Sequence, residues 1–196
     1  MKTGLMLVDI QNDYFPGGSM ELVAMDEAAE TASTVLEQFR QRKNPVYHIQ
    51  HISTRPGATF FVPGTEGMKT HASVASVEDE AVIQKNFPNS FRDTSLLETL
   101  RADSIEHLVI CGAMSHMCID ATTRAAFDLG FSCTVVSDAC ATRDLQFQGE
   151  PVSANNVHAA FMAALAVPYA SVVTAKELAK ELAKEFAVES ASGGNS

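Results

Sequence analysis

The sequence lacks any uninterrupted apolar stretch long enough to span a bilayer, which takes about 20 residues. Its first residues, MKTGLMLVDI, form a short apolar run that ends on an aspartate, without the small-residue cleavage site of a secretory signal peptide. These two absences predict a protein of the cytoplasm.

Basic residues are also scarce, since 14 Lys and Arg stand against 24 Asp and Glu and the formal net charge is −10. An acidic surface repels nucleic-acid phosphates and anionic lipids. We therefore expect no nucleic-acid partner and no membrane partner, and a small molecule as substrate. The length of 196 residues and the apolar fraction of 46% are typical of one globular domain.

The four cysteines include no Cys-x-x-Cys pair, which weakens a zinc or redox interpretation. In a cytoplasmic chain they should be free thiols. Cys111 and Cys133 lie inside apolar runs and are typical of small buried residues. Cys118 and Cys140 follow predicted strands, so these two need a separate explanation.

Strand-like apolar runs alternate with longer helical patterns along the chain. The runs predict strands at 4–10, 45–52, 81–85, 107–112, 132–138 and 169–175. The helical patterns predict helices at 26–43, 95–102, 117–129, 152–166 and 176–186. This alternation predicts an α/β fold, a three-layer αβα sandwich with a six-stranded, mainly parallel, Rossmann-like sheet. The domain should cover residues 1–188, with a functional loop at 53–80 and a disordered tail at 189–196.

Three residues with useful chemistry should meet at one edge of this sheet. Asp9 and Lys85 end predicted strands, and Cys118 lies near the start of the helix at 117–129. Active sites collect at the carboxyl ends of parallel strands. Taken alone, Asp9 could cap a turn, Lys85 could be a solvated surface residue, and Cys118 could be a buried inert thiol. Together they predict a Cys118 nucleophile whose pKa is lowered by the helix start and Lys85, with Asp9 as general base.

The loop GAMSHM before Cys118 offers two further ideas. Its backbone N–H groups could hold an oxyanion. His116 could serve as the base for Cys118, or the two residues could bind a metal together. Residues two apart at a helix start do not share a face, which weakens both roles for His116.

The segments VDIQNDYF, IQKNFPNSF and GAMSHMCIDATTRAAFDLG resemble the three signature blocks of the isochorismatase-like cysteine hydrolases, which include nicotinamidases and N-carbamoylsarcosine amidases. The blocks occur in the family's order, and the resemblance covers about residues 3–175. It implies a catalytic triad of Asp9, Lys85 and Cys118. It also implies a cis peptide between Ala113 and Met114, an oxyanion hole from the N–H groups of Met114 and Cys118, and a homo-oligomer, either a dimer or a tetramer.

Two departures from family patterns narrow the expected activity. Isochorismatases proper lack the cysteine, so Cys118 favours hydrolysis of a small amide, carbamoyl or imide substrate through a thioester. Nicotinamidases carry tryptophan-histidine and aspartate-x-histidine metal ligands, whereas this chain has only His48, His51 and His71 in the corresponding region. We therefore expect no metal and no cofactor, with His48 in the core and His51 in the pocket.

Aromatic and polar residues in the loops around the expected site are candidates for substrate binding. The set comprises Gln11, Phe15, His51, Phe60, Phe61, Phe91 and Met117. Two other functional classes stay open from the sequence. One is a catalytically idle binding or scaffold protein of the same fold. The other is a thiol-redox or metal sensor that uses Cys118 with Cys140 or His116.

Overall fold

The computed structural model describes the backbone of residues 1–192 and the side chains of residues 1–184. Within this part of the chain, six strands form one parallel sheet in the order β3-β2-β1-β4-β5-β8. The strands are β1 (Thr3–Val8), β2 (Val46–His51), β3 (Ala81–Lys85), β4 (His107–Ala113), β5 (Ser132–Ala141) and β8 (Ser171–Val173). The predicted α/β fold with a six-stranded parallel sheet is confirmed.

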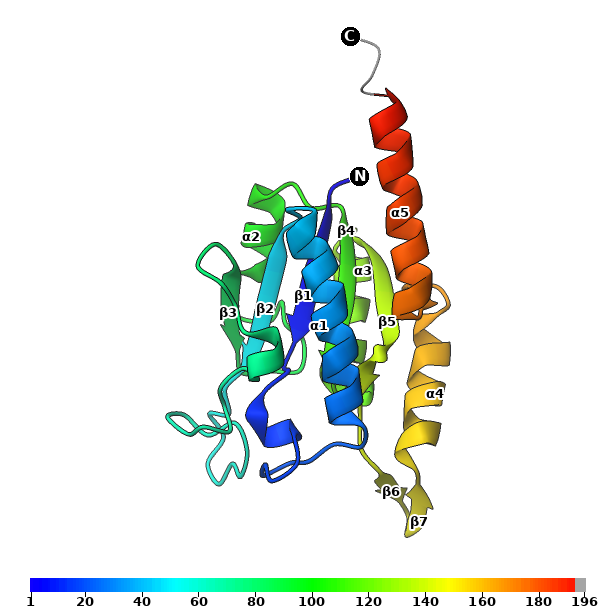
Figure 1. Cartoon of the computed structure of the whole chain (residues 1–196). Coiled ribbons are helices and arrows are strands. Elements are labelled where there is room, and N and C mark those ends of the chain that lie inside the picture. Colours follow the sequence, from blue (N-terminus) through cyan, green and yellow to red (C-terminus); the bar gives the residue numbers. More distant parts are fainter. Residues whose placement is uncertain (193–196) are drawn as a thin grey trace.

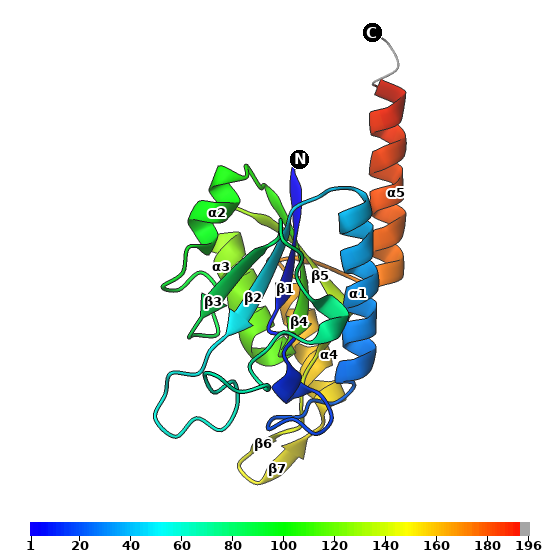
Figure 2. The ribbon, with the colours of Figure 1, turned by 60° about the vertical axis from the view of Figure 1, so that its left-hand side comes forward.

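Helices cover both faces of the sheet (Figures 1 and 2). One face carries α1 (Met25–Gln41) and α5 (Ala175–Ser192), and the other carries α2 (Leu96–Ala102), α3 (Asp120–Asp128) and α4 (Ala154–Leu165). Successive side chains of a strand point to opposite faces. Leu5 and Leu7 of β1 accordingly pack with the first pair of helices, and Met6 and Val8 pack with the second group. Strands buried on both faces explain the continuous apolar runs in the sequence.

The carboxyl ends of the central strands lie at one edge of the sheet. Val8 of β1 pairs with Ile49 of β2 and with Gly112 of β4, and His51 pairs with Lys85 of β3. Gly112 has a φ of 128°, and a Cβ at this position would collide with the Val8 carbonyl oxygen. Glycine is therefore required at this position of β4, beside the end of β1.

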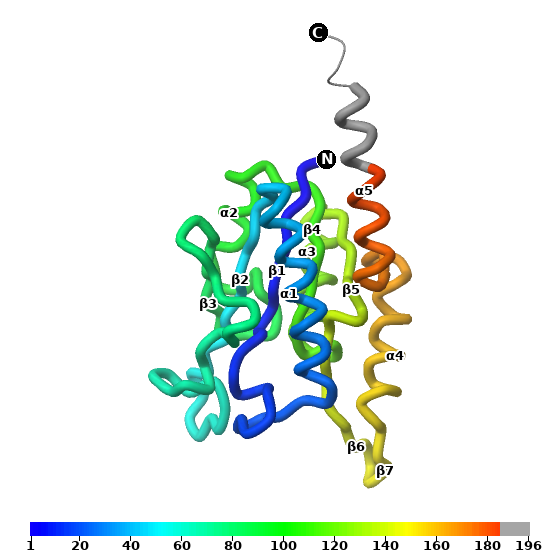
Figure 3. Tube along the Cα trace, in the orientation of Figure 1, coloured from blue at the N-terminus to red at the C-terminus, as the bar shows by residue number. Residues whose placement is uncertain are grey.

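The long segment between β2 and β3 lies beside the segment that follows β1, at this same edge (Figure 3). Backbone hydrogen bonds join the two segments, from Asn12 N–H to Lys69 O at 3.0 Å and from His71 N–H to Ile10 O at 2.9 Å. Most of the segment is irregular, as predicted, apart from the 3₁₀ turn η2 (Ala72–Val74). The loop thus forms a wall over the ends of β1, β2 and β3.

Some element boundaries differ from the prediction. β5 continues to Ala141 because its last residues pair with Gly112 and Ala113 of β4, so Cys140 lies inside a strand and does not follow one. Next comes an unpredicted hairpin, β6 (Leu145–Phe147) and β7 (Glu150–Val152), which extends from the body of the molecule (Figure 2).

The ends of two helices also differ. A π-helical turn, η3 (Ser115–Ile119), precedes α3, so that helix begins at Asp120 and not at 117. Helix α5 extends to Ser192, so the first four residues of the predicted tail are helical, while 193–196 lie outside the described residues. None of the described helices is both long enough and apolar enough to cross a membrane.

Candidate active site

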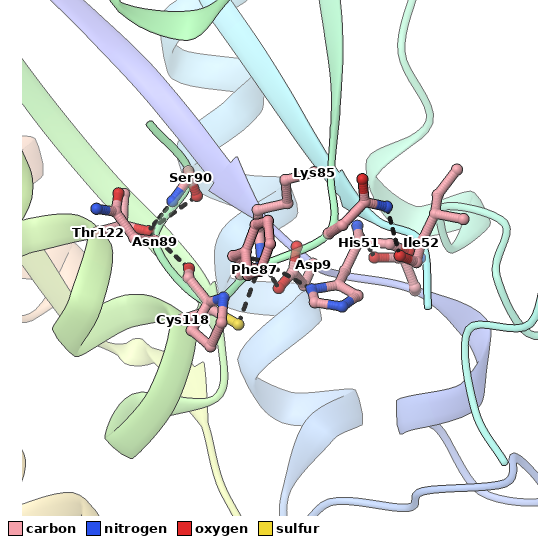
Figure 4. A network of polar contacts seen from close by, with 12 residues as sticks. Asp9, His51, Ile52, Lys85, Phe87, Asn89, Ser90, Cys118 and Thr122 are labelled. Carbon is pink, nitrogen blue, oxygen red and sulfur yellow. Dashed lines mark hydrogen bonds and ion pairs between the residues drawn. The ribbon is translucent and has the colours of Figure 1, made fainter. Parts of the chain in front are cut away.

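Lys85 contacts both Asp9 and Cys118, the other two residues that the sequence predicts at the carboxyl ends of the strands. Its Nζ donates to Asp9 Oδ2 at 2.7 Å and to Cys118 Sγ at 3.3 Å, and the side chains of Asp9 and Lys85 are completely buried. Figure 4 shows Lys85 between the other two residues. The parallel strands, with the turn η3 that follows β4, thus bring together side chains that lie 76 and 33 residues apart in sequence.

Asp9 lies just beyond the end of β1. Its N–H donates to Ile49 O at 3.0 Å, which continues the pairing with β2, and its φ of 53° turns the chain away from the sheet. Its Oδ1 is buried without a hydrogen-bond partner among the described residues. A carboxylate oxygen of Asp9 lies within 4.8 Å of Cys118 Sγ. Asp9 therefore has a free acceptor close to the thiol.

Cys118 lies in the π-helical turn η3. The Met114 carbonyl accepts from the N–H of Met117 at 3.0 Å and from the N–H of Ile119 at 3.2 Å. Its two donors are thus the residues on either side of Cys118. Turns of this kind are frequent at functional sites. The expected cis peptide between Ala113 and Met114 is present.

Charge and burial keep Cys118 as a thiol in the resting site. Burial, and after it the negative charge of Asp9, raise the pKa of the Cys118 thiol well above its ordinary value, and Lys85 offsets only part of this. The expectation of a lowered pKa was wrong, because the cysteine is 4% exposed and has a carboxylate beside it. Burial lowers the pKa of Lys85, but the Asp9 carboxylate, together with the contact to Cys118, outweighs burial and the net shift is upward.

His51 is a further contact of Lys85, whose Nζ also donates to Phe87 O at 3.1 Å. Lys85 Nζ lies 3.1 Å from His51 Nδ1, and an ammonium can only donate, so Nδ1 accepts and the ring proton is on Nε2. Burial lowers the pKa of His51 to about 4, with Lys85 and Arg55 adding to this effect and Asp9 opposing it. The imidazole is therefore neutral near pH 7.

A cavity of about 290 Å³ opens above Cys118. Eight consecutive loop residues, 53–60, form much of its wall. The other lining residues are Tyr14, His51, Asn86, Pro88, Met114, Met117 and Cys118. Pockets of this size accommodate small molecules. Asp9, Lys85, Cys118 and the cavity thus occupy one end of the sheet.

Comparison with known proteins agrees with this arrangement, since the profile of the Isochorismatase domain matches residues 3–177. The chain belongs to the isochorismatase family. It is 51% identical over 174 residues to the uncharacterized isochorismatase family protein YddQ of Bacillus subtilis, which covers 89% of this chain and 97% of that protein. The crystal structure of a protein from Oleispira antarctica assigned to the isochorismatase hydrolases is 53% identical, covers 90% of this chain and 95% of that chain, and superposes with a TM-score of 0.87.

Two more distant relatives have names that state an activity. A streptothricin hydrolase of Streptomyces noursei is 33% identical over 144 residues, which cover 72% of this chain and 50% of that protein. A nicotinamidase of Escherichia coli is 24% identical over 181 residues, which cover 74% of this chain and 85% of that protein. The chain is thus an isochorismatase-family hydrolase.

Side chains with metal-binding atoms do meet at this site. Among the described side chains, the one group of three with metal-binding atoms close together is Asp9, His51 and Cys118. The Lys85 ammonium already bonds to all three, so a cation occupies the space between them. His71 instead stacks on Phe15 with ring centroids 3.7 Å apart. These residues do not fit a metal ion.

Buried His48 also lies away from the cavity. It is 2% exposed, and its Nε2 contacts Glu80 Oε2 at 2.8 Å. The prediction of a core histidine is confirmed.

Four of the predicted substrate-binding residues do not line the cavity. Gln11 is fully buried, and its side-chain amide bonds to the backbone N–H and C=O of His51 and to Met68 O. Phe15 packs on His71, and Phe91 stacks on Phe131 with centroids 6.1 Å apart. Their roles as substrate contacts are corrected to structural ones.

The fourth of these residues is Phe61, which is 0% exposed and packs in the core behind the cavity wall. His51, Met117 and Phe60 do line the cavity, where the sequence placed them. Met114 and Cys118 line it as well. Some of the predicted loop aromatics therefore line the cavity wall, and others pack in the core.

Sequence reasoning did not single out several of the lining residues, among them Tyr14, Asn86 and Arg55. Tyr14 lies in the same signature block as Asp9, and its pKa is raised by burial and then by the ionisable neighbours Cys118 and Asp9. Asn86 directly follows Lys85, and its side chain donates to Ile52 O at 2.8 Å. Arg55 lies in the 53–80 loop, where its Arg-Pro-Gly context was the available signal.

The alternative partners of Cys118 are engaged elsewhere. His116 Nδ1 lies 2.6 Å from Thr142 Oγ1, and its ring contacts the edge of Phe161. Cys140 lies inside β5 and, like Cys118, is a free cysteine. Neither residue lines the cavity. The base, metal and sensor roles considered as alternatives for them therefore gain no support.

Proposed function

We propose that the chain hydrolyses a small amide, carbamoyl or imide substrate through a thioester on Cys118. The contact of Lys85 Nζ with both Asp9 and Cys118, beneath a cavity of small-molecule size, carries this proposal. A nicotinamidase and a streptothricin hydrolase among the relatives support hydrolysis at an acyl carbon. The presence of a cysteine at this position supports nucleophilic catalysis.

The first half of the reaction uses Asp9 as the proton carrier. Asp9 takes the proton of the Cys118 thiol, and the sulfur attacks the substrate carbonyl carbon. The carbon–nitrogen bond then breaks, and Asp9 returns the proton to the leaving nitrogen. Lys85 stabilises the negative charge, whether that charge is on the Cys118 sulfur or on the Asp9 carboxylate.

Water completes the reaction. Asp9 takes a proton from a water molecule, and the water oxygen attacks the thioester carbon. The carbon–sulfur bond breaks, the acid product leaves, and the proton returns to Cys118. The backbone N–H groups of Met114 and Cys118 would hold the oxyanion in both halves. One such donor contributes about 10²–10³ in rate in other enzymes.

Ammonia release from a panel of amides, carbamoyl compounds and cyclic imides tests the proposal. Cys118→Ala should abolish turnover of any substrate found, while Cys133→Ala, which changes a cysteine outside the cavity, should keep it. Removal of a catalytic nucleophile costs several orders of magnitude in other hydrolases. Full activity in Cys118→Ala would refute the mechanism. Failure of every compound in the panel to acylate Cys118, together with no turnover, would favour a binding protein.

We also propose that the chain acts on its small-molecule substrate in the cytoplasm as a dimer or tetramer. Light scattering on purified protein measures the oligomeric state directly. A monomer at micromolar concentration would contradict this part of the proposal.

A further inference from the structure

The cavity above Cys118 has an unusual charge for this chain. The chain has 24 acidic and 14 basic residues, yet no Asp or Glu lines the cavity. Arg55 is the one Lys or Arg among the lining residues. The wall of the pocket therefore carries a positive charge on an otherwise acidic protein.

The charges beneath the cavity do not cancel that of Arg55. Asp9 and Lys85 form a 2.7 Å ion pair with both side chains buried, so they largely neutralise one another. His51 is neutral because Lys85 donates to its Nδ1. Among the lining residues, the guanidinium of Arg55 is thus the uncompensated charge that an anion in the cavity would meet.

Arg55 is also available for a ligand. Its backbone carbonyl accepts from Ala58 N–H at 3.1 Å, which fixes a turn, but within residues 1–184 its side chain has no ion pair and no hydrogen bond. Its charge acts on the His51 ring, which places the guanidinium within electrostatic range of the catalytic contacts.

The loop that carries Arg55 is anchored at both ends. Ser53 N–H donates to Phe61 O at 2.9 Å, and Phe61 N–H donates to Asp13 Oδ2 at 2.6 Å. These bonds close residues 53–61 into a short loop over the cavity. The backbone of Arg55 is therefore held in the cavity wall, while its side chain is exposed.

We infer that the substrate is a small amide with a second, anionic group, most simply a carboxylate, and that Arg55 binds this group. The inference rests on the proposed function and adds the substrate's charge to it. A planar guanidinium binds a carboxylate through two parallel hydrogen bonds. The bond to be cleaved then lies over Cys118 while the carboxylate is held at the loop.

Alkylation of Cys118 tests the charge preference without a known substrate. Iodoacetate and iodoacetamide form the same carbon–sulfur bond and release iodide, and they differ in charge. We expect the ratio of their rates at Cys118, relative to the same ratio for glutathione, to favour iodoacetate by about tenfold or more. Arg55→Gln should remove this preference, and Arg55→Lys should keep part of it.

A matched control separates a local effect from the net charge. Arg101→Gln removes the same charge from an exposed position on α2 and should leave the ratio unchanged. The reaction is run at pH 9, because the thiol pKa is raised. A ratio equal to that of glutathione, or one that Arg55→Gln does not change, overturns the inference.

Binding gives a second measurement that does not depend on thiol reactivity. In calorimetric titrations, succinate should bind more tightly than the neutral succinamide. Arg55→Gln should lower the affinity for succinate by about 10- to 100-fold. Equal binding of both compounds, or succinate binding independent of Arg55, overturns the inference.

Turnover distinguishes failure of the inference from failure of the proposed function. If succinamate and butyramide are cleaved equally well in a Cys118-dependent reaction, the proposed function stands and the inference fails. If anions bind through Arg55 but Cys118→Ala retains turnover, the inferred anion site stands and the cysteine mechanism fails. If the proposed function and the inference both hold, the chain should cleave succinamate in preference to butyramide. Arg55→Gln should then reduce this preference by raising the KM for succinamate.

Discussion

The Lys85 ammonium lies 3.1 Å from Nδ1 of His51, and this contact determines where the ring of His51 carries its proton. Because Nδ1 accepts from Lys85, the Nε2–H is free to donate to a substrate in the cavity that His51 lines. Nitrogen-15 NMR of the histidine rings should show the Nε2–H tautomer of His51 at neutral pH. An Nδ1–H tautomer would contradict the contact.

The two nitrogens of His51 can be tested separately. Asn at this position keeps an acceptor near Nδ1, whereas Gln keeps a donor near Nε2. If the Nε2–H binds substrate, His51→Asn should raise KM by about tenfold, while His51→Gln should affect kcat through the lost contact with Lys85. Steady-state kinetics on both variants provide the measurement, and equal effects on KM would contradict the assignment.

The protonation of His51 should also depend on pH in a predictable direction. Its pKa in the folded chain is lowered to about 4, against 6.5 for an ordinary histidine. The unfolded chain therefore binds more protons between these values, so this residue lowers the free energy of unfolding as the pH falls from about 6.5 to about 4. NMR titration should show no ring protonation above pH 5, and a midpoint near 6.5 would contradict the prediction.

Loss of Lys85 should destabilise the fold as well as abolish activity. Lys85→Met would leave the Asp9 carboxylate buried without its cation, which typically costs about 3–5 kcal/mol. The double variant Asp9→Asn with Lys85→Met removes both charges and should recover much of this loss. Urea unfolding measures both free energies. A double variant less stable than Lys85→Met alone would contradict the explanation.

An exposed ion pair offers the matched control. Lys69 Nζ lies 2.6 Å from Glu66 Oε1, but these side chains are 60% and 81% exposed. Lys69→Met should therefore change the free energy of unfolding by less than about 1 kcal/mol. A large effect there would show that the loss of a lysine, and not the burial of a charge, is responsible.

The raised pKa of Cys118 predicts slow alkylation in the resting enzyme. Its rate with iodoacetamide should be below that of glutathione at pH 7 and should still be rising above pH 9. Lys85→Met should slow it further, because Lys85 lowers the thiol pKa. Cys118 should nevertheless react before the completely buried Cys111. Mass spectrometry of the labelled peptides measures these rates, and a rate above that of glutathione at pH 7 would contradict the prediction.

The sequence sufficed to place Asp9, Lys85 and Cys118 together because local patterns govern those positions. Each follows or ends an apolar run, and parallel strands align their carboxyl ends. The net effect on the Cys118 pKa could not be read in the same way. It depends on burial and on the distance to the Asp9 carboxylate, which only the packed structure fixes.

The residues of the pocket wall were harder to predict for a related reason. Gln11 bonds to His51 across 40 residues, and Asp13 bonds to Phe61 across 48. Such contacts decide which loop aromatic faces the cavity and which enters the core. Composition therefore indicated a functional loop at 53–80 but did not separate Phe60 from Phe61.

Asp13 should control the shape of that loop from outside the cavity. Its buried carboxylate accepts from Phe61 N–H at 2.6 Å and from Ser19 N–H at 3.1 Å, and a Cβ on Gly67 would collide with it. Asp13→Asn keeps the shape of the side chain but removes its charge and one acceptor. We expect about 1–3 kcal/mol of lost stability and faster hydrogen exchange across residues 53–61.

The kinetic consequence of Asp13→Asn distinguishes positioning from general damage. If Asp13 holds the wall that carries Arg55, KM should rise while kcat changes much less, because Asp13 touches none of the catalytic atoms. Asp79→Asn, at an exposed position before β3, should leave both constants unchanged. Slow hydrogen exchange in 53–61 together with an unchanged KM in Asp13→Asn would show that the wall holds its shape without this carboxylate.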